Sequence, residues 1–298
     1  MLHNIKHILS SVKDYVTIHT CFVVCLVFVL LFLSNAPVSN AQTGRYGDYN
    51  FLRPLSDLYL DGINGRVHVI VSYEGMAVRT ARGVVFSEEP LKIITEYNRA
   101  GNIMSKRVFR YGQLVEKSEY TYDVFGLKQT MKTTQSNGVL SLTIRYFYDE
   151  TTHLNDRQYC YNYKGKLTQS SRFYYNENRA VIRRVDYNEA GSRDELLISK
   201  YGINNHLSDE YSYKYARNDS ILMYGVHYKN DEHGNPLMLS QKIYNDRTGK
   251  YDKKFVHVRY YQYDQEGNWR VRCRYHNALS SDNHLIPNIL TIREIIYY

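Results

Sequence analysis

The sequence has 298 residues, enough for one large or two ordinary domains. Its 38 Lys and Arg residues outnumber 30 Asp and Glu residues, and the net charge of +8 is spread along the whole chain. So mild an excess is typical of a solvated surface and leaves binding to an acidic polymer as the alternative.

The first 41 residues have the parts of a secretory signal peptide. Two lysines precede an apolar run of thirteen residues, 21–33, which is shorter than the roughly 20 residues needed to span a bilayer. Small residues at Ser39 and Ala41 predict cleavage after Ala41, with no permanent membrane span afterwards; an uncleaved anchor is the alternative. We therefore expect an exported protein, in the periplasm, at the cell surface or secreted, and export argues against nucleic acid as its partner.

Residues 42–92 contain short β-like runs. The segment 66–73 reads RVHVIVSY, the segment 83–86 is similarly apolar, and both follow a Gly-rich turn at 61–65. We predict that residues 42–92 form an N-terminal β cap and that residues 93–298 form a second, repetitive domain.

The repetitive part is marked by tyrosine, which occurs 31 times. The unit is a Tyr at a strand end, an Asp or Asn, two variable residues and a Gly; in the copy at Asp231 the Tyr, Tyr228, lies two residues further back. The copies have their turn residues at Asn98 and Gly101, Asp123 and Gly126, Asn162 and Gly165, Asn188 and Gly191, Asp231 and Gly234, and Asp264 and Gly267. Looser copies lie between these and give a period of about 13 residues.

Each unit has the chemistry of a hairpin turn. The Asp or Asn side chain accepts hydrogen bonds from nearby backbone amides, and Gly adopts a positive φ that other residues resist. Where Gly is missing, as after Asn176, we expect Asn178 to take this conformation. The repeated aspartates are therefore turn formers rather than catalytic acids.

The residues between turns alternate as in β-strands. After Gly267, one face carries Trp269, Val271, Cys273 and Tyr275 and the other carries Arg270, Arg272 and Arg274. Because single hairpins are marginally stable, we expect the units to stack side by side. The predicted fold is all-β: an elongated array of stacked antiparallel hairpins behind the N-terminal cap, preceded by a signal-peptide helix. The segment 289–298 would be a closing edge strand, protected from further pairing by Arg293 and Glu294.

The pattern resembles bacterial YD-repeat proteins, which are related to RHS and teneurin-type repeats. The segment 263–268, YDQEGN, is the best match, and the resemblance covers roughly residues 93–275. It implies hairpin architecture and surface or export biology. The chain has too few units for the large shells of that family, and its last repeat is followed by too few residues for a C-terminal toxin domain.

Few residues suggest a chemical site. Cys160 and Cys273 are expected to be buried thiols, with a disulfide between them as the alternative. The histidines lack metal-binding spacing, and no cofactor or nucleophile motif is present, so we predict no metal, no cofactor and no catalytic residue. The sharpest ligand-binding candidates are Arg270, Arg272 and Arg274 with Tyr261 and Tyr263, although the simpler explanation of this cluster is a solvated outer face.

The predicted function is a non-catalytic scaffold or binding protein of the bacterial cell envelope. Its ligand would be a protein or a glycan, and its oligomeric state is left open. One alternative is an envelope enzyme with a site between the N-terminal cap and the first repeats. Another is an accessory partner of a toxin or secretion system.

Overall fold

The computed structural model describes residues 56–202, 205–216, 219–277 and 285–298. All of them belong to the compact unit Ser39–Tyr298. The predicted signal peptide and the cleavage after Ala41 lie outside the described residues.

The described residues form one short helix and seventeen strands. The helix is α2 (Asp57–Leu60). The strands are β1 (Val67–Thr80), β2 (Gly83–Phe86), β3 (Leu91–Tyr97), β4 (Ile103–Arg110), β5 (Gln113–Tyr122), β6 (Lys128–Gln135), β7 (Leu140–Tyr148), β8 (Asn155–Asn162), β9 (Leu167–Tyr175), β10 (Val181–Asn188), β11 (Arg193–Tyr201), β12 (Leu207–Ala216), β13 (Asp219–Asn230), β14 (Pro236–Asn245), β15 (Lys250–Tyr263), β16 (Trp269–Asn277) and β17 (Leu285–Tyr297).

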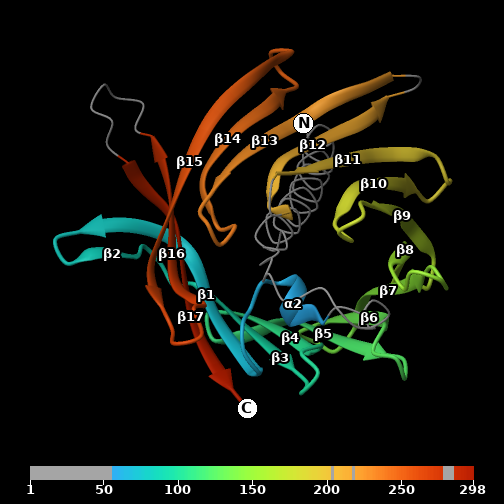
Figure 1. The fold of residues 1–298 in the computed structure, drawn as a ribbon, viewed down its shortest axis with the longest axis horizontal. Coiled ribbons are helices and arrows are strands. Elements are labelled where there is room, and N and C mark those ends of the chain that lie inside the picture. The colour runs from blue at the N-terminus through green and yellow to red at the C-terminus, as the bar shows by residue number, and fades with distance from the viewer. Residues whose placement is uncertain (1–55, 203–204, 217–218, 278–284) are drawn as a thin grey trace, which may run out of the picture. The chain divides into compact units, whose positions relative to one another are not determined.

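Sixteen of these strands close into an antiparallel barrel (Figure 1). From β3 to β17 each strand pairs with the next one along the chain, and β1 pairs with both β3 and β17. Strand β2 is outside the ring, because it pairs with Ala77–Thr80 at the end of β1 and forms a side hairpin.

The predicted elongated array with a cap is therefore wrong, although the all-β class is right. An open array would leave the backbone N–H and C=O groups of two edge strands unpaired. Pairing β1 with β17 provides hydrogen-bond partners for the backbone groups of both strands. Residues of the supposed N-terminal cap form strand β1 of the ring. The C-terminal segment is likewise an internal strand, with β16 on one side and β1 on the other. The period of about 13 residues is one strand plus one turn, so successive turns lie at opposite rims of the barrel.

The turns at the strand ends explain the repeated tyrosine, acidic residue and glycine. The Asp264 carboxylate accepts hydrogen bonds from the amides of Glu266 at 3.0 Å and Asn268 at 2.9 Å, and Gly267 has a φ of 79°. After Asn176, however, the residue with positive φ is Arg179, at 62°, and not Asn178. Position in the turn thus outweighs the preference of Asn for this conformation.

Among the residues that the structure describes, buried apolar side chains form two small clusters. One cluster joins α2 to the inner wall and contains Leu58, Ile63, Val67, Ile70 and Tyr97. A second contains Cys273, Tyr275 and Leu290, against which Ala77, Val84 and Phe86 of the side hairpin pack. Barrels of about 16 strands are too wide for side chains alone to fill, which is consistent with this dispersed packing.

Candidate functional site

The two faces of the barrel follow from the strand register. Lys128 of β6 forms an ion pair with Asp57 of α2, which lies within the ring of strands, so Lys128 belongs to the inner wall (Figure 1). Residues directly opposite each other on paired strands share a face. Followed around the ring, the register places Asp186 of β10, Glu210 of β12 and Arg272 of β16 on the same wall as Lys128.

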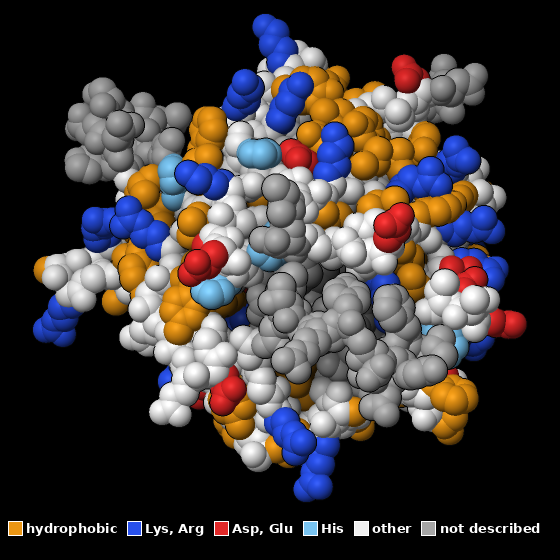
Figure 2. Space-filling view, viewed as in Figure 1, with side chains coloured by type: hydrophobic (Ala, Val, Ile, Leu, Met, Phe, Trp, Pro, Cys, Tyr) orange, Lys and Arg blue, Asp and Glu red, His pale blue; other side chains and the backbone are white. Residues whose placement is uncertain are grey.

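The outer face carries many charged side chains. Arg107 forms an ion pair with Glu96, and Lys117 lies 2.7 Å from Glu119, both on the outward side of β3 to β5. Cations also lie over outward tyrosine rings: Lys92 over Tyr73, Arg145 over Tyr161, Arg183 over Tyr174, Lys200 over Tyr211, Lys242 over Tyr251 and Arg259 over Tyr275. Figure 2 shows Lys and Arg side chains at many points around the periphery of one end of the molecule.

The inner wall carries a row of three arginines, which we call the arginine row: Arg274, Arg272 and Arg293. Arg272 of β16 is paired with Thr291 of β17. Arg274 lies two residues further along β16, and Arg293 lies two residues beyond Thr291 in the opposite direction. Alternation along each strand therefore brings all three guanidinium groups to the same face.

One tryptophan ring joins two members of this row. The guanidinium carbons of Arg272 and Arg293 lie 4.7 Å and 3.5 Å from the centre of the Trp269 ring. Arg272 also donates to the Thr291 hydroxyl at 3.4 Å, and its nearest carboxylate is Glu74 of β1 at 3.8 Å. Only 7% of Arg272 is exposed, and its Nε is buried without a hydrogen-bond acceptor.

Arg274 and Arg293 remain charged at neutral pH despite their burial. Burial, followed by the positive charge of Arg272, lowers the pKa of both Arg274 and Arg293 to about 10. Burial is the larger cause, and the neighbouring charge of Arg272 adds to both shifts. An anion beside these groups would offset that neighbouring positive charge.

The structure divides the predicted cluster of three arginines and two tyrosines. Arg272 and Arg274 lie on the inner wall, whereas Arg270 is exposed and donates to the Arg293 carbonyl at 3.3 Å. Tyr261 is half exposed, and its hydroxyl is bonded to that of Tyr275, whereas Tyr263 pairs with Trp269 across the hairpin. Register shifts at Gln262 also break the expected alternation, since Trp269 lies against Arg272 instead of facing away from it.

Sequence reasoning missed Arg293 and Glu74 as members of this site. Arg293 was expected to protect an exposed edge, yet it faces the inside of a closed ring. The alternation of Leu290 and Ile292 with Thr291 and Arg293 does contain the signal, because it marks one polar and one apolar face. Nothing in the sequence shows that β1, and with it Glu74, lies beside this strand.

A second polar group fixes α2 to the inner wall. The Asp57 carboxylate accepts hydrogen bonds from Lys128 Nζ at 2.7 Å, from the amide of Ile103 at 2.9 Å and from the Tyr122 hydroxyl at 2.6 Å. The Lys128 ammonium also lies 5.0 Å from the centre of the Tyr120 ring. Because every charged member has a partner, we interpret this group as an anchor for α2 rather than a ligand site.

A neighbouring acidic residue of the anchor has a shifted pKa. Asp61 lies 3.3 Å from the Tyr97 hydroxyl, which donates to it. Burial, assisted by the negative charge of Asp57, raises the pKa of Asp61 from 3.8 to about 6, although Lys128 and Arg293 oppose the shift. We therefore expect the segment around α2 to respond to mildly acidic pH.

Carboxylates lie on another part of the inner wall. Glu195 of β11 is paired with Asp186 of β10 and accepts a hydrogen bond from Ser212. Glu210 of β12 accepts one from the Tyr224 hydroxyl at 3.1 Å, and burial raises its pKa. Arg184, two residues before Asp186 on β10, lies 3.1 Å from its carboxylate, so this part of the wall carries both acidic and basic side chains.

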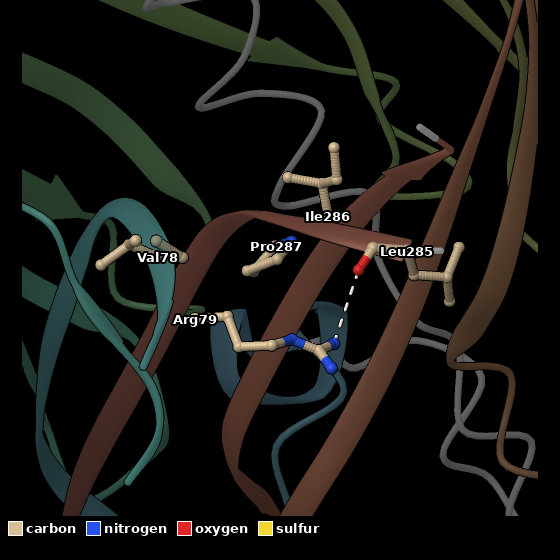
Figure 3. Close-up of a pocket in the computed structure, with 6 residues that line it drawn as sticks. Val78, Arg79, Leu285, Ile286 and Pro287 are labelled. Atoms are coloured by element: carbon tan, nitrogen blue, oxygen red, sulfur yellow. Dashed lines mark hydrogen bonds between the residues drawn. The ribbon is translucent and has the colours of Figure 1, made fainter. Parts of the chain in front are cut away.

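Two shallow hollows lie outside these clusters. Beyond the Met76–Ile289 pair, β1 and β17 diverge and leave a hollow of about 450 Å³ (Figure 3). Figure 3 shows its mainly apolar lining and the hydrogen bond of 3.4 Å from Arg79 to the Leu285 carbonyl. The other hollow, of about 430 Å³, lies between the segment 56–67 and the turn at 98–101, with Glu266 as the carboxylate in its lining.

The other predicted residues are located as follows. The structure places the repeated pairs in turns, with positive φ at Gly101, Gly126, Gly165, Gly191, Gly234 and Gly267. The Asp or Asn of each pair accepts hydrogen bonds from amides two and four residues later: Asn98, Asp123, Asn162, Asn188, Asp231 and Asp264. Cys160 of β8 and Cys273 of β16 are both free thiols.

Within the described ranges, no group of His, Cys, Asp or Glu side chains is arranged to hold a metal ion. None of the helices in that same part of the chain is both long and apolar enough to cross a membrane.

Comparison with known proteins gives a fold but no family. No protein-family model and no curated protein sequence matches the chain. A porin-like protein from Bacteroides uniformis superposes with a TM-score of 0.51 at 9% sequence identity, over 78% of this chain and 99% of its own. A protein of unknown function from Bacteroides fragilis gives 0.32 at 12% identity, over 45% of this chain and 94% of its own. A porin-like protein from Bacteroides vulgatus gives 0.24 at 11% identity, over 78% and 99%.

The last two scores are too low to define a shared fold. The first agrees with the strand pairing and defines a porin-like, 16-stranded antiparallel β-barrel. The resemblance to YD-repeat and RHS-type proteins was therefore wrong. The short tyrosine and glycine pattern marks antiparallel hairpin turns, which a closed barrel needs as much as a repeat array does.

Proposed function

We propose that the protein is an exported, non-catalytic binding protein of the bacterial cell envelope whose barrel is surrounded by water. The predicted signal peptide supports export, and the porin-like fold supports an envelope setting. The ligand would bind at the polar inner wall, while the charged outer face would keep the barrel in solution.

The observation that carries this proposal is the charge of the outer face. A barrel that crosses a bilayer needs an outward apolar band roughly 25 Å tall. Here Arg107 and Lys117 lie within strands β4 and β5, on the outward side, with Glu96 and Glu119 beside them. Each outward Arg or Lys at the bilayer midplane would cost about 2 to 4 kcal/mol.

Charged side chains also lie on the outer face at the far side of the ring. Asp209 of β12 lies 2.9 Å from His227 of β13 on the outer face, and Lys200 of β11 lies over the Tyr211 ring beside them. Charged groups therefore interrupt any outward apolar band at well-separated points of the circumference. This argues for an aqueous surrounding on more than one side.

A membrane-inserted porin is the second candidate. The strand number favours it, and so do outward aromatic side chains such as Phe147 and Phe255, which are 41% and 42% exposed. Phe147 follows Arg145 by two residues on the same face, however, and Lys253 precedes Phe255 in the same way. The aromatic residues are thus interspersed with charges, and a water-exposed barrel explains the surface better.

The absence of catalysis is also part of the proposal. The alternative of an enzyme places its site in the hollow between the segment 56–67 and the first hairpin. Its lining contains the single carboxylate of Glu266, together with Arg66 and Arg99. Such a set offers charge and hydrogen bonds, but among these lining residues it lacks a paired acid and base.

Membrane partition tests the proposal. The full-length chain would be expressed and the exported protein recovered from the soluble fraction without detergent, then mixed with liposomes and with planar bilayers. We expect it to stay in solution during flotation and to produce no conductance. Recovery only with detergent, together with stable conductance steps, would show a membrane porin instead.

A further inference from the structure

The inner wall holds three cationic side chains that are close together and only weakly neutralised. We propose that the arginine row, Arg274, Arg272 and Arg293, binds a small acidic ligand that carries at least two oxyanion groups, either carboxylates or phosphates. This inference rests on the proposed binding function and names the chemistry of the ligand.

The charge balance of the arginine row favours binding of an anion. Among the described residues, Glu74 is the carboxylate within 4.0 Å of a member, and it contacts Arg272 alone. Its Oε2 is shared, because the Thr291 hydroxyl also donates to it at 3.2 Å. Asp61 acts on Arg293 only from a longer range. Three positive charges are thus opposed by one adjacent negative charge.

Arg272 is buried in the inner wall and held in place by its neighbours. It is 7% exposed, and its buried Nε–H has no acceptor. An unpaired buried donor costs about 1 to 3 kcal/mol, so a fold tolerates it mainly where something else supplies the acceptor. Contact with the Trp269 ring holds the guanidinium in place, and Arg293 lies against the same ring. Two donors are therefore pre-organised before any ligand arrives.

The spacing of the row sets the size of the ligand. Residues two apart on one face of a strand are about 6.6 Å apart, so the ends of the row are roughly 13 Å apart. Guanidinium groups bind carboxylate and phosphate through two parallel hydrogen bonds. A single small ion would reach one or two of the arginines, whereas a ligand with spaced oxyanions, such as a short acidic oligosaccharide or a short polyphosphate, would reach all three.

The fluorescence of Trp269 can be used to detect binding at this site. Trp269 is the one tryptophan in the sequence, and its ring contacts two of the three guanidinium groups. An anion that draws Arg272 or Arg293 toward itself changes the surroundings of the indole. Intrinsic tryptophan fluorescence therefore reports on this site alone.

The test is a fluorescence titration of the exported protein at low salt with three probes. Trigalacturonate carries carboxylates, tripolyphosphate carries phosphates, and neutral galactotriose is the uncharged control. We expect a saturable change with at least one anionic probe, weakened by added NaCl, and no change with galactotriose. The probe that binds identifies the type of oxyanion, and equilibrium dialysis with the same probes checks binding independently of the fluorophore.

Variants locate the binding. Arg274 has no hydrogen bond from its guanidinium to a described residue, so Arg274→Gln should fold normally and bind at least tenfold more weakly. Arg293→Gln should weaken binding similarly. Arg259→Gln is the matched control, because Arg259 lies over the outward ring of Tyr275, 5.4 Å from its centre, and its loss should leave binding unchanged.

Three results would overturn the inference: no saturable binding of either anionic probe, equal binding of galactotriose, or undiminished binding by a folded Arg274→Gln variant. These failures are separate from failure of the proposed function. A protein that floats with liposomes contradicts the water-exposed barrel. A soluble protein that binds neither anionic probe contradicts only the role of the arginine row.

Discussion

Tyr73 near the start of the described chain is paired directly with Ile292 near its end. The two residues belong to β1 and β17, and their pairing turns a sheet with two edges into a ring. Opening this seam would expose the backbone N–H and C=O groups of β1 and β17, so we expect it to contribute to the stability of the ring.

Proline substitution tests the importance of the seam. Ile292→Pro removes a backbone N–H from a strand with neighbours on both sides and should lower the free energy of unfolding by at least about 1 to 3 kcal/mol. Val85→Pro is the control, since β2 lies outside the ring, and its effect should be clearly smaller. Urea unfolding followed by circular dichroism gives both values, and similar effects of the two substitutions would argue against closure.

Alanine substitutions at two turn glycines distinguish the cost of backbone strain from the cost of lost packing space. Both Gly101 and Gly165 have positive φ, 83° and 73°, so alanine at either position should cost about 1 to 3 kcal/mol. A Cβ at Gly101 would also lie 3.0 Å from Ser56 Oγ and 3.2 Å from Leu58 Cδ1, whereas nothing lies within 4 Å at Gly165. We expect Gly101→Ala to lower the melting temperature more than Gly165→Ala. Equal shifts would mean that the segment around α2 does not pack on this turn.

The anchor of α2 should depend on a buried ion pair. Asp57→Ala leaves Lys128 without its partner, and the two side chains are only 10% and 18% exposed. Breaking such a pair costs about 3 to 5 kcal/mol. The exposed outer pair is the control: Glu119→Ala beside Lys117 should cost no more than about 1 kcal/mol. Denaturant unfolding of both variants measures the difference, and a cost below about 1 kcal/mol for Asp57→Ala would contradict the anchor.

Mild acid should stabilise the protein through Asp61. Its pKa in the folded state is raised to about 6, above the ordinary value of 3.8, so the folded state binds more protons between these two pH values. Stability contributed by this group is present at low pH and is lost as the pH rises through about 6. Asp61→Asn imitates the protonated form and should flatten the profile of urea midpoints between pH 4 and pH 7. A variant with the parent profile would show that Asp61 titrates normally.

The local structure of this protein could be read from its sequence. Asp264 and Gly267 indicate a turn because carboxylate acceptors and positive φ are requirements of the turn itself. The alternation of Val256 and Val258 with His257 and Arg259 indicates a strand because side chains of an extended backbone point alternately to its two faces. The all-β class followed from these signals, each of which extends over only a few residues.

The binding candidates could be read only in part. Arg272 and Arg274 were found through their alternation on one strand, yet their exposure was misjudged, because a strand pattern does not say which face is inside. Arg293 and Glu74 join them only after β16, β17 and β1 have become neighbours. Trp269 departs from the alternation because of a register shift on the opposite strand, and no residue near Trp269 in the sequence indicates it.

The sequence by itself determined the hairpins, their turns and their period. Only the tertiary structure decided that the hairpins close into a ring, and with it which face is inside and which charges meet there. The physical reason is that a turn is stabilised by contacts a few residues apart, whereas closure is stabilised by pairing β1 with β17, more than 200 residues away, where the same tyrosine-rich strands fit an open array equally well.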